Sequence, residues 1–295
     1  MRLSAATLVG TLATTSAMAA CSRRPSSSDE TLAPSASAAQ RMAPGPSALP
    51  TASAKPYTGP VGTIRGSVRV VGDAAPVLED VLRNIPDECA GARGVYGTLF
   101  RAGPGGEAAD VLVTVTDYQH YVPAASDHVE VVGKDCAWNT RTVGMTMGQH
   151  LEVSARDAKG YVPNLIGLPT PANMIPVPGG AAARLKPTRP GRHGLNDLAH
   201  LFAYADVFVV KFSTLAVTGL DGRFEISGVP AGTATVSALL PAAMLVDQRK
   251  VTVKANETTT VDFELTFDEA RYQAQRKQSA PPAPSSSTAP SPSAN

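Results

Sequence analysis

The sequence predicts an all-β protein, because its middle part is a series of short runs that are rich in valine and threonine. Glycine, proline, asparagine and aspartate separate these runs at a spacing typical of one β-sandwich or a pair of them. Two runs, 63–71 and 110–116, place apolar residues at alternate positions, which is the period of a half-buried strand. The predicted strands are 63–71, 110–116, 128–132, 141–147, 150–155, 207–212, 215–218, 223–226, 233–239, 249–253 and 259–267.

Helices are predicted to be few and short. The stretch 76–84 is compatible with one turn of helix, and 267–275 with a short C-terminal helix that has Asp268 and Glu269 near its start. The tightest predicted turn is Asp221-Gly222, between the runs 215–218 and 223–226, because glycine tolerates a positive φ.

The chain begins with the pattern of a secretion signal that ends in a cysteine. Arg2 supplies the positive charge, an uncharged apolar stretch follows, and Met18, Ala19 and Ala20 directly precede Cys21. This arrangement resembles a bacterial lipoprotein signal at 1–20, although leucine is more usual where Met18 stands, and it implies that Cys21 carries a lipid. The alternative is an ordinary cleaved signal, and a membrane span is less favoured because the apolar run is too short.

Composition narrows the choice of partners. The chain has 295 residues with 26 basic and 25 acidic side chains, which gives no basic patch of the kind that nucleic acid requires. The segment 21–57 and the end of the chain are rich in serine, proline and alanine, so we expect a disordered tether and a disordered tail. The three cysteines allow one disulfide, Cys89 with Cys136, if Cys21 carries lipid; two free thiols are the alternative.

The segment AVTGLDGRFEISGVPAGTATVSAL, followed by RKVTVKANETTTVDFEL, resembles the carboxypeptidase regulatory-like module, a small transthyretin-like β-sandwich. The resemblance covers roughly 216–265 and implies a structural or binding module without catalytic residues. We therefore divide the chain into a signal (1–20), a tether (21–57), a first β domain (58–212), this module (213–268), and a short helix with a disordered tail (269–295). The sequence leaves open whether the strand near Ile64 belongs to the module.

The first β domain resembles the cupredoxin-like domains that precede such modules in exported bacterial proteins. The resemblance rests on a cysteine, a Gly-Gln that begins a strand, and the segment DLAHLFAYADVFVVKF that leads into the module. It aligns His200 with the histidine of a CxxHxxM copper motif. The thiolate position is then Asp197, the thioether position is Ala203, and the first histidine falls on Tyr161 or Pro163. The resemblance thus implies a cupredoxin-like fold without copper.

Other constellations suggest no catalytic site and no cofactor. His200, His193 and Asp197 are the candidate ligands for a metal such as Cu(II) or Zn(II), but a solvated loop is the favoured interpretation because no histidine pair has ligand spacing. Hydrolase, P-loop and dinucleotide motifs are missing from the sequence. The long stretch 163–190, with Met174, Ile175 and Val177, is the expected place for a partner to bind.

The leading functional hypothesis is a non-enzymatic, lipid-anchored envelope protein that acts as a structural or binding module for envelope proteins or glycans. Ser22 after the lipid cysteine favours the outer membrane, facing the periplasm or the cell surface. A periplasmic copper-binding or electron-transfer protein and a carbohydrate-binding accessory protein are the alternatives.

Overall fold

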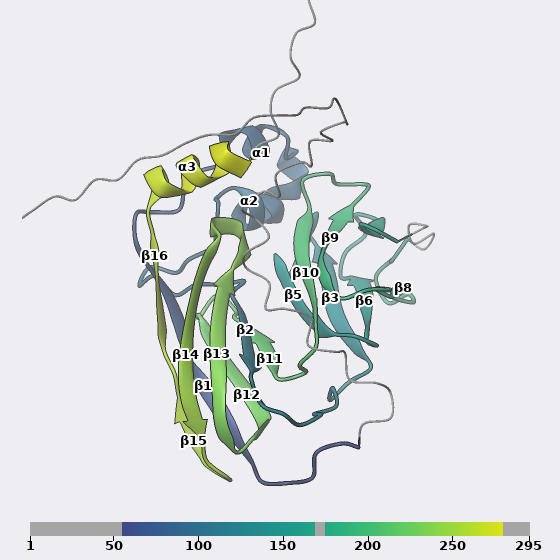
Figure 1. Ribbon diagram of the computed structural model, residues 1–295. Helices are drawn as coiled ribbons and strands as arrows, with labels where there is room; N and C mark the ends of the chain where they lie inside the picture. Colours follow the sequence, from purple (N-terminus) through teal and green to yellow (C-terminus); the bar gives the residue numbers. More distant parts are fainter. Residues whose placement is uncertain (1–54, 169–174, 280–295) are drawn as a thin grey trace, which may run out of the picture. The chain divides into compact units, whose positions relative to one another are not determined.

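The computed structural model describes residues 55–168 and 175–279. In these ranges the strands form two β-sandwiches, each with its own buried core (Figure 1). The predicted all-β class is confirmed. The segment 1–54, which holds Cys21 and most of the predicted tether, and the tail 280–295 lie outside the described residues.

Sandwich A contains the two sheets built around β1 and β2. The first sheet contains β1 (Val61–Gly72), β12 (Arg223–Pro230), β15 (Thr258–Thr260) and β16 (Phe263–Phe267). The second contains β2 (Leu112–Thr116), β11 (Leu215–Val217), β13 (Gly232–Leu240) and β14 (Leu245–Val253). The alternating residues predicted to face inward do so: Ile64 and Val68 of β1 and Val113 of β2 are fully buried in this core.

Sandwich B contains the two sheets built around β3 and β10. The first contains β3 (His128–Lys134), β4 (Ala137–Trp138), β6 (His150–Ala155) and β8 (Ala183–Leu185). The second contains β5 (Thr142–Thr146), β7 (Pro163–Leu165), β9 (Gly191–Asp197) and β10 (Tyr204–Val210). Its core includes Cys89, Cys136, Trp138 and Tyr161.

Sandwich A is discontinuous in sequence, which answers the question that the sequence left open about the strand near Ile64. β1 pairs with β12 antiparallel and with β15 and β16 in parallel, so Val68 lies opposite Phe263 (Figure 1). β2 lies between β11 and β13. The structure thus differs from the predicted division at 58–212 and 213–268, because the alternation of a strand shows which face is buried but not which partner it pairs with.

The helices are short, as predicted. They are α1 (Glu79–Arg83), the 3-10 turn η2 (Asp87–Cys89), α2 (Ala90–Tyr96), the 3-10 turn η3 (Pro241–Ala243) and α3 (Glu269–Ser279). The predicted helices 76–84 and 267–275 correspond to α1 and α3. Helix α2 was not predicted, because Gly91 and Gly94 weaken its intrinsic helix propensity. No helix among the described residues has the length and apolar character that crossing a membrane needs.

Candidate functional site

Asp197 and His200, two of the three candidate ligands, are neighbours, and the side chain of His200 is only 15% exposed rather than solvated as expected. Asp197 ends β9 and is fully buried. Its Oδ1 accepts hydrogen bonds from the backbone N–H of Val162 at 2.6 Å and of Ala199 at 3.0 Å, and its Oδ2 lies 2.7 Å from Nδ1 of His200. The carboxylate therefore holds together the turn between β9 and β10.

The predicted disulfide between Cys89 and Cys136 is present beside this turn. Its Cα atoms are 5.4 Å apart and both cysteines are buried. Their sulfur atoms and a ring nitrogen of His200 lie within 4.8 Å of one another. Tyr161 contacts the His200 ring with centroids 5.6 Å apart, and Trp138 packs on Tyr161 with centroids 5.4 Å apart. The disulfide, the tyrosine and the tryptophan thus belong to one core, and the half-buried ring of His200 lies beside it.

The residues around His200 do not fit a blue-copper centre, which needs a thiolate, two imidazoles and usually an axial thioether. Both sulfur atoms are in the disulfide. The hydroxyl of Tyr161 donates to Asp157 Oδ1 at 3.0 Å and accepts from the Cys136 N–H at 3.1 Å, and burial raises the pKa of this hydroxyl. The buried Ala203 has no donor atom at the thioether position. We therefore derive no step through copper at this site.

His193 does not join Asp197 and His200. It lies four residues before Asp197 on the same strand, a distance of about 13 Å along an extended backbone. Its Nε2 lies 3.0 Å from the backbone oxygen of Arg189. The three candidate ligands named from the sequence are therefore not one site in the described part of the chain.

A second histidine group lies on the other sheet of sandwich B. His128 on β3 is the register partner of His150 on the parallel strand β6, and Glu152 follows two residues later on the same face. Ligand atoms of these three residues lie within 4.8 Å of one another. This group cannot be recognised in the sequence because 22 positions separate the histidines, and only the parallel pairing of β3 with β6 brings them together.

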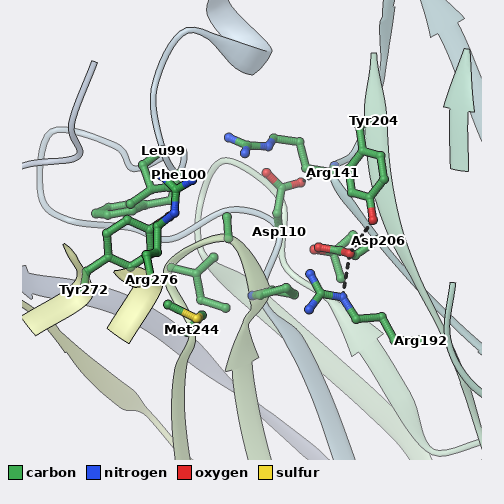
Figure 2. A pocket seen from close by; sticks show the side chains of 14 residues that line it. Leu99, Phe100, Asp110, Arg141, Arg192, Tyr204, Asp206, Met244, Tyr272 and Arg276 are labelled. Atoms are coloured by element: carbon green, nitrogen blue, oxygen red, sulfur yellow. Dashed lines mark hydrogen bonds and ion pairs between the residues drawn. The ribbon is translucent and has the colours of Figure 1, made fainter. Parts of the chain in front are cut away.

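A cleft of about 310 Å³ is lined by residues from both sandwiches (Figure 2). We call it the arginine cleft. Its charged and phenolic side chains are Asp110, Arg141, Arg192, Tyr204, Asp206, Tyr272 and Arg276, and its apolar lining includes Leu99, Phe100, Leu240, Pro241 and Met244. A volume of this order is at the lower end of the range for small-molecule sites.

The two carboxylates of the arginine cleft are already neutralised by arginines. Asp110 accepts from Arg101 Nε at 2.7 Å and from its Nη2 at 2.6 Å, in the bidentate arrangement. Asp206 accepts from Arg192 Nε at 2.8 Å and from the Tyr204 hydroxyl at 3.0 Å (Figure 2). Burial and the adjacent carboxylate raise the pKa of Tyr204 to about 12, so its hydroxyl stays a donor at neutral pH.

Two arginines add positive charge to the cleft. Arg141 donates to the backbone oxygen of Thr98 at 2.9 Å, and burial lowers its pKa. Arg276 lies on α3 with its guanidinium carbon 5.9 Å from the ring centroid of Tyr272. Neither arginine forms an ion pair with a carboxylate of residues 55–168 or 175–279. The sequence does not reveal this cleft, because Asp206 alternates along β10 with the core residues Ala205 and Val207 and so lies on the opposite face of the strand.

The stretch 163–190 is not one continuous loop. β7 and β8 lie within it and pair with β9 and β6 respectively. Met174 lies outside the described residues, whereas Ile175 and Val177 are more than half exposed. The apolar surface expected there therefore includes at least these two side chains.

No protein-family model and no curated protein matches the chain. Solved structures of amicyanin are similar to part of it. Amicyanin from Paracoccus versutus is 17% identical, with 33% of this chain and 97% of amicyanin covered and a TM-score of 0.25. A Cu(I) form of an amicyanin mutant is 16% identical, with 33% and 98% covered and a TM-score of 0.25.

Proposed function

We propose that this chain is a non-enzymatic, exported and lipid-anchored protein that binds a small anionic ligand in the arginine cleft. The observation that carries the proposal is the charge of the lining. Asp110 and Asp206 each have an arginine partner, so Arg141 and Arg276 leave the cleft with excess positive charge. A carboxylate or phosphate group is the complement that two guanidinium groups recognise.

The apolar lining favours an organic anion over an inorganic one. Phe100, Met244 and Tyr272 lie on one side of the cleft, and Arg192 with Asp206 on the other (Figure 2). Arg276 lies beside Phe100 and Tyr272, so an organic anion can contact a guanidinium and this apolar side together (Figure 2). The lining includes no histidine, cysteine or serine, and its two carboxylates are engaged in ion pairs, which supports binding rather than acid-base or nucleophilic catalysis.

Calorimetric titration with phenyl phosphate, benzoate and benzylamine tests the cleft. We expect the two anions to bind and the amine not to bind. The substitution Arg276→Gln should weaken anion binding by about twofold to fivefold, because the guanidinium is exposed and its charge is screened. Lys277→Gln is the matched control, since it removes the same charge from α3 outside the lining. Equal affinity for the amine, or equal weakening by both substitutions, would show that the cleft is not an anion site.

The lipid anchor is supported by the signal that ends at Cys21 and by the disulfide that uses the other two cysteines. Labelling cells with a palmitate analogue tests it. The unchanged protein should carry label and sediment with membranes, whereas Cys21→Ala should be unlabelled. An unlabelled native protein would contradict the anchor without affecting the cleft.

A further inference from the structure

His128, His150 and Glu152 converge at one end of the parallel pair β3–β6. His128 and His150 are register partners, and their rings are 5.8 Å apart between centroids. Nε2 of His150 lies 3.3 Å from Oε1 of Glu152, and Nε2 of His128 lies 3.8 Å from Oε2 of the same carboxylate. Two imidazole nitrogens therefore face one carboxylate from two strands.

These separations are close to those between ligands of one tetrahedral ion. Bonds of about 2.0 to 2.2 Å from Zn²⁺ to nitrogen or oxygen put neighbouring ligand atoms about 3.3 to 3.6 Å apart. The nitrogen of His150 is already at this distance from the carboxylate, and that of His128 is only slightly farther. Small side-chain rotations would thus complete the three-ligand arrangement.

Neighbouring charged side chains hold two of these residues in place, as the hydrogen-bond partners of ligands do in metal sites. Nδ1 of His128 lies 2.8 Å from Oδ1 of Asp127, a contact that leaves Nε2 of the same ring directed at Glu152. Arg184 donates from Nε to Oε1 of Glu152 at 2.9 Å and fixes the carboxylate while Oε2 faces His128. A carboxylate on the outer nitrogen of a ligating histidine is the usual device for holding the ring and raising its basicity.

We propose that His128, His150 and Glu152 form a binding site for a divalent transition-metal ion of the Zn²⁺ or Cu²⁺ class. Two imidazoles and one carboxylate suit these ions, whereas Mg²⁺ and Ca²⁺ favour sites built of oxygen atoms alone. The side chain of His128 is 40% exposed and that of His150 is 16% exposed, so the remaining coordination positions face solvent. A metal ion bound at this site would exchange with ions in the solvent. It is independent of the arginine cleft, whose lining shares no residue with it.

Isothermal titration with Zn²⁺ tests the site on the full chain, purified without a histidine tag. We expect one ion per chain in the unchanged protein and no measurable binding in His128→Ala or His150→Ala. Glu152→Gln keeps the shape of the side chain but removes its charge, and should also abolish binding. Asp127→Asn should weaken binding by about tenfold, because it removes only the group that orients His128.

The controls are His120→Ala and His200→Ala. His120 is an exposed histidine outside the group, and His200 is the histidine beside the disulfide. Both variants should bind Zn²⁺ as the unchanged protein does. Loss of binding in His200→Ala with retention in His128→Ala would overturn the proposal and assign the ion to the disulfide neighbourhood. Retention in all ligand variants would also overturn it, and circular dichroism of each variant shows that lost binding is not lost folding.

Discussion

The Asp110 side chain accepts four hydrogen bonds from three other residues. Its side chain is 4% exposed and forms the bidentate pair with Arg101. Its Oδ1 also accepts from the Thr140 hydroxyl at 3.1 Å and from the Arg141 N–H at 2.8 Å. Asp110 lies two residues before β2 of sandwich A, whereas Thr140 and Arg141 lie just before β5 of sandwich B, so this one carboxylate connects the two sandwiches.

Replacement of Asp110 by alanine should lower the free energy of unfolding by about 3 to 5 kcal/mol, since it leaves a nearly buried guanidinium without its partner. Its backbone φ of 63° adds to the cost, because alanine disfavours that region. Urea unfolding measures the change. Asp80→Ala is the control: that carboxylate is 90% exposed beside Arg83, so little change is expected. A loss no larger than that of Asp80→Ala would contradict this role.

The raised pKa of Tyr204 makes the free energy of unfolding depend on pH in the alkaline range. Burial and Asp206 raise the pKa of its hydroxyl to about 12 in the folded state, whereas an unfolded tyrosine has a pKa of about 10. The unfolded state therefore loses its proton first, and the contribution of Tyr204 to stability is full below pH of about 10 and is lost as the pH rises through 12. Tyr204→Phe should show a shallower loss of stability over this range in denaturant titrations. If the free energy of unfolding fell equally steeply with pH in both proteins, folding would not raise the pKa of Tyr204.

At the scale of elements, turn chemistry was readable from the sequence and strand pairing was not. The Asp221-Gly222 turn occurs as predicted, with Gly222 at φ of 68°. The predicted strand 259–267 is instead divided into β15 and β16. Between them, the N–H of Val261 donates to the backbone oxygen of Arg65, and Asp262 Oδ1 accepts from the Ser67 N–H at 2.8 Å. Here a side-chain oxygen takes the place of a backbone oxygen in the hydrogen bonding between strands. Such a break cannot be predicted from the alternation of apolar residues.

Gly222→Ala should lower the free energy of unfolding by at least about 1 kcal/mol. Alanine disfavours the positive φ, and its Cβ would lie 2.6 Å from the backbone oxygen of Val68 on β1. Gly219→Ala in the same turn should change stability little, because its Cβ would meet only Asp221 Oδ1, at 3.5 Å. Thermal unfolding compares the two variants, and an equal effect would contradict the requirement for glycine at 222.

At the scale of the whole chain, the strands of sandwich B are inserted in the sequence between two groups of strands that together form sandwich A. β1 and β2 belong to sandwich A, β3 to β10 form sandwich B, and β11 to β16 return to sandwich A. β1 contacts three strands of the later segment, and β2 contacts two of them. The segment that resembles a complete module at 213–268 therefore lacks two inner strands of its own sandwich.

A fragment of residues 213–279 should accordingly fail to fold. Without β1 and β2 it retains only the β13–β14 pairing, and an isolated two-stranded hairpin is marginally stable in water. The longer fragment 55–279 should fold, since it contains every described strand. Amide proton dispersion in NMR spectra distinguishes the two outcomes. A dispersed spectrum from the monomeric short fragment would contradict the discontinuous sandwich.

The sequence by itself determined the strand class, the inward faces of β1 and β2, the Asp221-Gly222 turn and the disulfide pair. These follow from local rules: alternation, turn residues and cysteine number. The lipid on Cys21 stays a prediction from the same kind of rule. Tertiary structure alone decided the partners of β1 and β2, the separation of His193 from Asp197, the convergence of His128 with His150, and the charge of the arginine cleft. Strand register and the packing of two cores fix these features, and both depend on contacts between distant segments that no local pattern records.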